Sequence, residues 1–272
     1  MSFVNQEQIM KEVLPLSESL IDEGSVNILL QGPAGCGKTK LAGILAERIT
    51  ESWAFQIPVK GDINWPKMDD FRVHIIDEIH MFKRFELLYP LMDSGEHIFI
   101  FCTTEYGETP DPFLTRCIRF SFEPYSLESL TLIVRKYAQS RKFTFPTDGC
   151  YSLIAEASRG TPRLAKQRFD RVKLLLEHYG YPKREGYVNS ILNQIGIFKG
   201  GYTKEDFRYM EYLHRVGHSS LDNIARVLQI DKNTIAKEIE PYLFERGHIE
   251  LSSRGRQFKH HLTPNPLVRG IG

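Results

Sequence analysis

The chain has 272 residues, of which 42% are hydrophobic and 25% charged, with a formal net charge of +1 at pH 7. This composition is that of an ordinary globular protein and excludes a fibrous or disordered chain. No apolar run approaches the ~20 residues that cross a bilayer, and the first residues lack the pattern of a secretory signal. We therefore expect a cytoplasmic protein without a membrane partner. Because the molecule as a whole is not basic, any affinity for nucleic acid has to come from a local patch.

Short apolar runs alternate with helical segments in the first half of the chain. The runs are Val26–Gln31, Phe55–Val59, Val73–Asp77, Ile98–Thr103 and Ile118–Phe122. This alternation predicts an α/β core over residues 1–124, in which a parallel sheet is covered by helices.

A phosphate-binding loop lies between the first apolar run and the helix expected over Leu41–Ile49. Its residues match G-x-x-x-x-G-K-[ST] and are Gly32, Pro33, Ala34, Gly35, Cys36, Gly37, Lys38 and Thr39. The glycines let backbone N–H groups surround a phosphate at the positive end of a helix. Lys38 then contacts the β- and γ-phosphates of ATP, and the Thr39 hydroxyl is a ligand for Mg²⁺.

Two acidic residues and two threonines follow later apolar runs. Asp77 and Glu78 come directly after Val73–Ile76, where Asp77 is expected to hold Mg²⁺ and Glu78 to polarise the attacking water. Thr103 and Thr104 end the run that starts at Ile98, and either could reach the γ-phosphate. Two threonines that merely cap a strand are the alternative.

Two arginines are further candidates for the nucleotide site. Arg116 lies just before an apolar run, where it either pairs with a local carboxylate or acts as an arginine finger in a neighbouring subunit. Arg163 follows Pro162 at the start of a helix, and a cation at a helix N-terminus is unfavourable unless a phosphate is near. We therefore count Pro162 and Arg163 with the nucleotide-binding residues.

The rest of the chain divides into a helical region and a C-terminal domain. Residues 125–182 show helical spacing and predict a small lid, and residues 183–202 contain breakers and predict a linker. Over residues 203–272, three helices beginning near Thr203, Ser220 and Asp231 precede two strand-like runs, His248–Leu251 and Gln257–Leu262. This order is typical of a winged-helix DNA-binding domain.

A basic cluster marks the end of the winged helix. Beyond Gly247 the basic residues Arg254, Arg256, Lys259 and Arg269 face a single acid, Glu250. Such a cluster suits sequence-independent contacts with DNA phosphates, with Arg254 and Arg256 at a hairpin tip. A solvated basic loop is the alternative.

Taken together, these motifs resemble those of the RuvB family of AAA+ ATPases. The resemblance rests on the phosphate loop, on the Thr103–Thr104 pair and on six further segments: Phe3–Gln6, Ile75–His80, Leu88–Asp93, Arg159–Arg163, and Glu240–Leu243 with Arg254–Arg256. It implies an ATP- and Mg²⁺-dependent motor on double-stranded or branched (Holliday junction) DNA, and a ring, expected to be a hexamer. It also implies that Thr103 or Thr104 is sensor 1, Arg116 the arginine finger and Arg163 sensor 2.

One departure bears on the partner, and two other functions remain open. Only Asp93–His97 separates Met92 from Ile98, where the family carries a long β-hairpin that grips RuvA, so a RuvA-like partner is not expected. The Phe113–Cys117 segment also resembles clamp-loader ATPases, which makes a clamp-loader-like or helicase-loader-like assembly factor the main alternative. A DNA-binding regulator, in which ATP controls only oligomerisation, is the third possibility.

Overall fold

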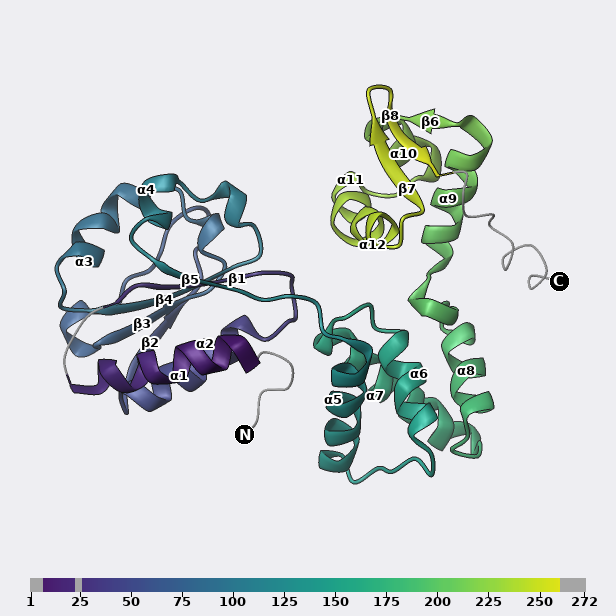
Figure 1. Cartoon of the computed structure of the whole chain (residues 1–272), viewed down its shortest axis with the longest axis horizontal. Coiled ribbons are helices and arrows are strands. Elements are labelled where there is room, and N and C mark those ends of the chain that lie inside the picture. The colour runs from purple at the N-terminus through teal and green to yellow at the C-terminus, as the bar shows by residue number, and fades with distance from the viewer. Residues whose placement is uncertain (1–6, 23–25, 260–272) are drawn as a thin grey trace. The chain divides into compact units, whose positions relative to one another are not determined.

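The computed structural model describes residues 7–22 and 26–259. The described chain forms two compact units (Figure 1). The first contains the residues up to Thr144 together with Gly160–Phe169, and the second contains Phe145–Arg159 and the residues from Asp170 onward. The predicted Phe3–Gln6 motif and Arg269 lie outside the described residues. Within the described ranges, no helix is long and apolar enough to cross a membrane.

A five-stranded parallel sheet forms the centre of the first unit, as predicted. Its strands, in spatial order, are β2 (Trp53–Gln56), β3 (Val73–Ile76), β4 (Ile98–Thr103), β1 (Ile28–Gln31) and β5 (Ile118–Ser121). The second strand was misplaced, since it begins at Trp53 and ends at Gln56. Val59 instead exchanges backbone hydrogen bonds with Asp62 in a turn.

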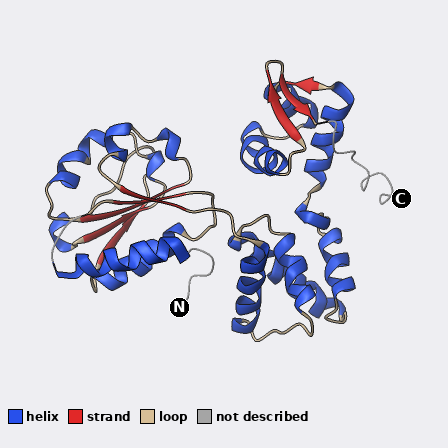
Figure 2. Ribbon diagram, viewed as in Figure 1, coloured by secondary structure: helices blue, strands red, loops and turns tan. Residues whose placement is uncertain are grey.

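Helices cover both faces of this sheet (Figures 1 and 2). Helices α1 (Glu7–Asp22) and α2 (Lys38–Ile49) lie on one face, and α3 (Tyr89–Asp93) and α4 (Asp111–Leu114) on the other. Every residue of β4 is buried, as expected for a central strand of a two-sided parallel sheet. Phe99 and Phe101 of β4 stack on one another, and Phe101 packs against Phe113 of α4, which holds that layer on the sheet.

The region predicted as a lid is helical, as predicted. It contains α5 (Leu127–Ser140), α6 (Asp148–Glu156) and α7 (Pro162–Tyr179), and Tyr137 of α5 packs against Phe169 of α7. The division between the two compact units falls inside this region, so that α5 is assigned to the first unit, α6 to the second, and α7 runs from one into the other. The segment predicted as a linker contains helix α8 (Glu185–Gln194). Val188, Ile191 and Leu192 of this helix are buried. Their burial stabilises a helix in a segment whose breaker residues had suggested an irregular linker.

The C-terminal residues form a winged helix, as predicted. Its helices include α9 (Lys204–Val216), α10 (Leu221–Leu228), α11 (Lys232–Thr234) and α12 (Glu240–Glu245). Thr203 and Asp206 form the predicted capping box at the start of α9, and Ser220 and Asp231 cap α10 and α11. The domain also contains a three-stranded sheet, whose strands in spatial order are β6 (His218–Ser219), β8 (Gly255–Phe258) and β7 (Ile249–Ser252). Strand β6 was not predicted.

Candidate functional site

The predicted nucleotide-site residues follow three neighbouring strands at one edge of the sheet. The phosphate loop follows β1, Asp77 and Glu78 follow β3, and Thr104 follows β4. These strands are adjacent and parallel, with Gln31 paired to Thr103 and Ile76 to Phe101. The carboxyl ends of parallel strands are where α/β sheets bind ligands.

The phosphate loop has the backbone that its glycines were expected to provide. Gly32, Gly35 and Gly37 all have positive φ, and Gly37 lies directly before α2. A Cβ at Gly32 would lie 2.5 Å from the Phe122 carbonyl oxygen, so no larger residue fits there. The loop therefore leads the chain tightly from β1 into a helix N-terminus.

Lys38 lies beneath this loop and is almost completely buried. Its ammonium group donates to the carbonyl oxygens of Gly32, at 2.7 Å, and Pro33, at 2.8 Å. Burial lowers the pKa of Lys38, and the carboxylate of Glu78 opposes that shift most strongly. A buried ammonium beside a helix N-terminus fits a bound polyphosphate, because the anion would replace the lost hydration.

Asp77 and Thr39 meet where a magnesium ion would be expected. The Thr39 hydroxyl donates to the Asp77 carboxylate at 2.8 Å. Among the described residues, no group of three or more His, Cys, Asp or Glu side chains could hold a metal ion. Two oxygen ligands fit Mg²⁺, which takes few protein ligands and fills its shell with water and phosphate oxygens.

Glu78 is held in an unusual backbone conformation by its neighbours. It has φ 51° and ψ 47°, and its N–H is bonded to the Asp77 side chain at 3.0 Å. Such a conformation costs energy for a non-glycine residue and often occurs at functional sites. The Glu78 carboxylate lies within hydrogen-bond distance of Thr104, which follows β4.

The structure distinguishes between the two threonines that the sequence left open. The Thr104 hydroxyl donates to the Glu78 carboxylate at 3.1 Å. Thr103 is fully buried, and its hydroxyl oxygen bonds to the His80 ring and accepts from the Glu105 N–H. Thr104 therefore contacts the acid of the site, and Thr103 has a supporting position.

His80 was not identified from the sequence. Its ring lies 3.1 Å from the Thr103 hydroxyl, 3.4 Å from the Glu78 carboxylate and 3.9 Å from Glu105. The sequence offered two signals for it, its place at the end of the Ile75–His80 motif and its spacing of three residues from Asp77. It orders the two carboxylates next to the nucleotide site.

Arg163 lies at the start of α7, directly after Pro162, and packs against the phosphate loop. A Cβ at Gly35 would be 2.8 Å from the Arg163 Cβ and 2.9 Å from the Thr161 methyl group. The Tyr125 hydroxyl donates to the Cys36 carbonyl oxygen at 3.0 Å and holds the same side of the loop. The structure thus brings Arg163 to the loop, as the sequence predicted.

Arg116 lies at the opposite edge of the sheet from the phosphate loop. It precedes β5, which is parallel to β1, and its carbonyl oxygen accepts from Asn27, the residue before β1. A four-residue strand spans about 13 Å, so Arg116 does not belong to the nucleotide site of its own chain.

The Arg116 guanidinium is oriented by a carboxylate of α3. Nε donates to both oxygens of Asp93 at 2.9 and 3.1 Å, and Nη2 donates to one of them at 3.1 Å. Nη1 donates to the Pro112 carbonyl oxygen at 2.8 Å, and the group lies 4.6 Å from the centre of the Tyr89 ring. The local carboxylate considered from the sequence is therefore present, and it holds one edge of the guanidinium.

The basic end of the winged helix differs from the expectation in one respect. Arg254 lies in the exposed turn between β7 and β8, as predicted, and Lys259 pairs with Glu250 at 3.5 Å. Arg256 lies within β8, and its guanidinium pairs with the buried Glu240, at 2.8 Å from Nε and 3.2 Å from Nη2. The expectation that both arginines project from the tip is thus corrected, because a buried carboxylate requires a charged partner.

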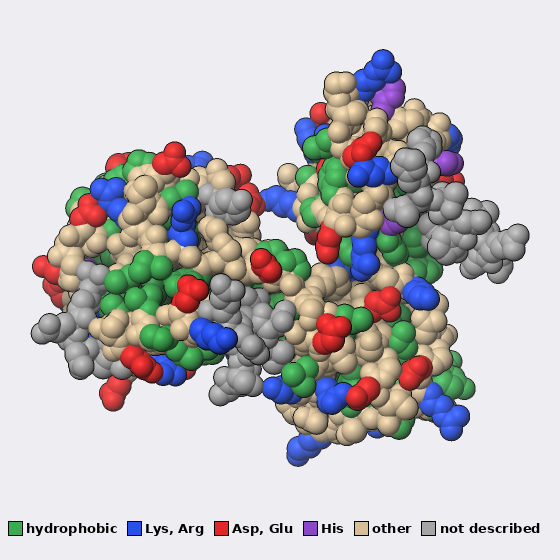
Figure 3. Space-filling view, viewed as in Figure 1, with side chains coloured by type: hydrophobic (Ala, Val, Ile, Leu, Met, Phe, Trp, Pro, Cys, Tyr) green, Lys and Arg blue, Asp and Glu red, His purple; other side chains and the backbone are tan. Residues whose placement is uncertain are grey.

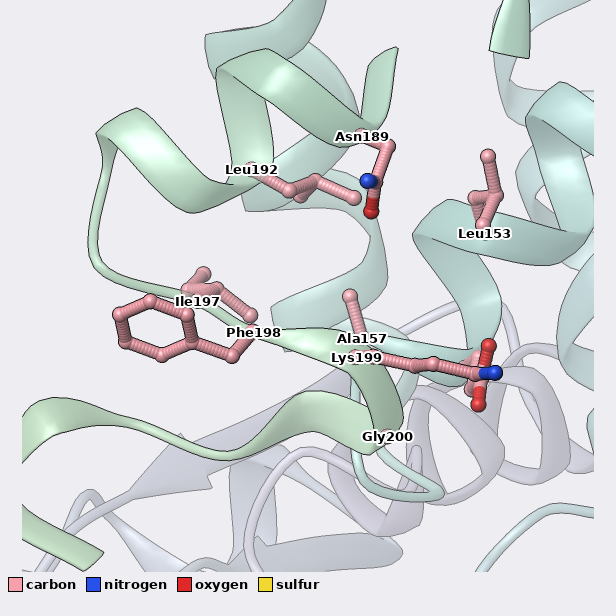
Figure 4. A pocket seen from close by; sticks show the side chains of 9 residues that line it. Leu153, Ala157, Asn189, Leu192, Ile197, Phe198, Lys199 and Gly200 are labelled. Carbon is pink, nitrogen blue, oxygen red and sulfur yellow. The ribbon is translucent and has the colours of Figure 1, made fainter. Parts of the chain in front are cut away.

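Outside the nucleotide site, the described residues include one face of mixed charge and one hollow. In the view of Figure 3, basic and acidic side chains are interspersed over the described surface and do not gather into one basic face. A hollow in the second unit is lined mainly by α6, α8 and the Ile197–Gly200 segment (Figure 4). It contains none of the predicted site residues.

Comparison with known proteins agrees with this geometry. Residues 199–261 match the family described as the RuvB C-terminal winged helix domain. The chain is 31% identical to the Holliday junction branch migration complex subunit RuvB of Anaplasma marginale, over 93% of this chain and 87% of that protein. It is likewise 31% identical to the Campylobacter jejuni subunit, over 93% and 86% of the two chains.

Solved structures show the same fold. The RuvB branch migration motor of Thermotoga maritima superposes with a TM-score of 0.81 over 95% of this chain and 93% of that chain, at 24% identity. Domain III of the T. maritima replication initiation protein DnaA superposes over 71% of this chain, with a TM-score of 0.54 and 15% identity. With a winged helix of its family and relatives of this identity along nearly its whole length, the chain belongs to the RuvB family.

Proposed function

We propose that this protein is an ATPase that moves branched DNA, as the names of its relatives state for Holliday junctions. One observation carries the proposal. Lys38, Asp77, Glu78 and Thr104 converge at one edge of the sheet in a chain that also contains a winged helix.

We assign a separate role in ATP hydrolysis to each residue of the site. Lys38 and the N–H groups of the phosphate loop bind the β- and γ-phosphates. Glu78 orients and polarises the attacking water, while Thr104 fixes the Glu78 carboxylate through its hydroxyl. Thr39 and Asp77 would hold Mg²⁺, which supplies charge neutralisation at the phosphates when bound.

Two arginines complete the charge balance around the γ-phosphate. Arg163, beside Gly35, is positioned to contact the nucleotide of its own chain, as proposed for sensor 2. Arg116 lies at the far edge of the sheet and would serve the site of the next subunit as an arginine finger. This division requires subunits that contact one another head to tail, and we propose that they form a closed hexameric ring.

The winged helix would carry the DNA contacts. Arg254 at the exposed turn, together with Lys259, supplies positive charge for phosphates without reading bases. The connection from α3 to β4 contains only Ser94–His97. Since this leaves no room for a long hairpin, we propose that the protein does not use a RuvA-like partner in the manner of its relatives.

The alternative of a clamp-loader-like or helicase-loader-like factor is less well supported. The likeness to DnaA domain III is one of fold, and it covers a smaller part of this chain than the likeness to the RuvB motor does. The family match at residues 199–261 favours a DNA motor.

The test is ATP hydrolysis and branch migration on four-way DNA, with linear duplex DNA for comparison. The wild-type protein is expected to hydrolyse ATP faster with four-way DNA and to convert the four-way DNA into two duplexes by branch migration. Lys38→Ala should abolish both activities, and Lys40→Ala, an exposed lysine of the same helix, should retain them. Hydrolysis without any movement of the junction would favour the loader function instead.

A further inference from the structure

Arg159 makes an extensive set of contacts that the proposed catalytic residues do not account for. It follows α6 with φ 48°, and only 13% of its side chain is exposed. Its Nε donates to the Gly201 carbonyl oxygen at 2.8 Å, and Nη1 donates to the Glu238 carbonyl oxygen at 3.1 Å. Nη2 bonds to the carboxylate of Asp206. The guanidinium also stacks on Tyr242, 4.1 Å from the ring centre.

The partners of Arg159 belong to different segments of the second unit. Asp206 is completely buried and also accepts from the Thr203 N–H and hydroxyl, so one carboxylate caps α9 and binds Arg159. Glu238 lies in the helical turn before α12, and Tyr242 lies in α12 itself. One guanidinium thus connects the end of α6 to three segments: the turn that contains Gly201, helix α9 through Asp206, and the helical residues Glu238 and Tyr242.

The backbone around Gly201 also lies very close to the end of α6. A Cβ at Gly201 would lie 3.1 Å from the Glu156 carbonyl oxygen and 3.2 Å from that of Ala157. The Tyr242 hydroxyl donates to the Gly200 carbonyl oxygen. The end of α6 and the segment before α9 are therefore packed tightly, and a side chain at Gly201 would force the backbone there to shift.

The residues directly after Arg159 are tied to the nucleotide site of the first unit. The Gly160 carbonyl oxygen accepts from the Tyr125 N–H at 2.9 Å. Thr161 and Arg163 lie against Gly35 of the phosphate loop. Of the five consecutive residues 159–163, Arg159 at one end therefore bonds to residues of the winged helix, and Thr161 and Arg163 toward the other end lie against the phosphate loop.

We propose that Arg159 is a positioning residue that transmits the nucleotide state sensed near Arg163 to the winged helix. The proposal rests on the proposed function of Arg163 and of the winged helix. A displacement of residues 160–163 by the nucleotide moves the peptide unit that carries Arg159, and its bonds pass the movement to α9 and α12. Without these bonds, ATP hydrolysis continues, but the winged helix no longer moves in response to the nucleotide state.

The chemistry of arginine is required for this role. A planar guanidinium offers five donors in fixed directions and can bind three segments at once while stacking on an aromatic ring. A lysine at the same position keeps the charge opposite Asp206 but loses the fork and the stacking plane. Arg159→Lys is therefore the informative variant, because it does not leave a buried carboxylate without a cation.

The experiment compares wild type, Arg159→Lys and a control, Arg208→Lys. Arg208 belongs to the same helix as Asp206, but its guanidinium donates to the Leu228 carbonyl oxygen, at 2.9 Å, and this bond stays within the winged helix. We measure basal ATP hydrolysis, DNA affinity and branch migration per ATP hydrolysed. Arg159→Lys should keep the first two within about twofold and lose at least about tenfold in the third, a coupling of ordinary size. The control should keep all three.

A second measurement separates this inference from the proposed function. Hydrogen exchange over residues 199–206 is followed with and without ATP, in the absence of DNA. Wild type should change its exchange on binding ATP, and Arg159→Lys should bind ATP without that change. If wild type fails to move DNA but shows the ATP-dependent change, the motor function is refuted and the coupling stands. If wild type shows no change, or Arg159→Lys responds as wild type does, the coupling role of Arg159 is overturned.

Discussion

The Thr104 hydroxyl donates a hydrogen bond to the carboxylate of Glu78, at 3.1 Å, across the ends of two adjacent strands. This bond joins the proposed sensor to the proposed general base. It also assigns different tasks to two neighbouring threonines, because Thr103 is buried against His80.

Thr104→Val should lower kcat for ATP hydrolysis by roughly 10²-fold while ATP affinity stays close to wild type, because the Glu78 carboxylate loses the donor that orients it. Steady-state hydrolysis and nucleotide titration measure the two quantities. Thr103→Val is the matched control, and its effect on kcat should be clearly smaller. Equal losses in the two variants would contradict the assignment.

Asp93→Asn tests whether the Asp93 carboxylate orients the guanidinium of Arg116, the proposed arginine finger. The Asp93 carboxylate binds the Nε edge of Arg116, which leaves N–H groups on the terminal nitrogens for a phosphate of the next subunit. We expect hydrolysis by the assembled protein to fall about threefold to tenfold, because the guanidinium loses its fixed direction. Faster hydrolysis would show that Asp93 restrains the finger instead.

The two arginines of the β7–β8 hairpin should behave differently. Arg254→Ala should weaken DNA binding uniformly across sequences and reduce the slope of log affinity against log salt by about 1. Arg256→Ala should lower the free energy of unfolding by about 2–4 kcal/mol, because it leaves Glu240 buried without its cation. Salt titrations and denaturant unfolding measure these effects, and the reverse pattern would refute the assignment.

His74 predicts a pH dependence of stability. Burial, together with the nearby His97, lowers the pKa of His74 to about 4, from the usual 6.5. The ring bonds to the Phe71 carbonyl oxygen through Nε2 at 3.0 Å, which fits a neutral imidazole that donates from this atom. The unfolded chain therefore gains a proton near pH 6.5 that the folded chain gains only near pH 4.

As the pH falls through this window, His74 should reduce the free energy of unfolding by up to about 3 kcal/mol, and the loss should level off below about pH 4. Because carboxylates titrate in the same range, the informative quantity is the difference between wild type and His74→Phe. That difference should change with pH between 6.5 and 4, and a constant difference would contradict the prediction.

Local patterns accounted for much of the fold and of the site. The phosphate loop, the acids after β3 and the capping box of Thr203 and Asp206 depend on residues close together in the sequence, so spacing was sufficient to predict them. The alternation of apolar runs with helical segments was likewise sufficient to predict the parallel sheet. The exposed Ile57 and Val59 misled the placement of β2, because apolar residues that follow an edge strand do not need to belong to it.

Other features depend on residues that are distant in the sequence. Arg256 reads as a DNA contact until Glu240, 16 residues earlier, is seen to pair with it. Arg159 appears as part of a motif, while its partners lie 42 to 83 residues later in the chain. No local pattern reports such pairings, since they arise only when the segments have packed together.

Mixing two inactive variants tests most directly whether one catalytic site is built from two subunits. Lys38→Ala lacks the phosphate-binding lysine and Arg116→Ala lacks the finger, so neither variant should hydrolyse ATP at an appreciable rate. In a mixed ring, the intact Lys38 of one subunit meets the intact Arg116 of its neighbour, and part of the hydrolysis should return as the two are combined. If the mixture stays inactive and Arg116→Ala alone hydrolyses ATP as wild type does, the shared site is contradicted.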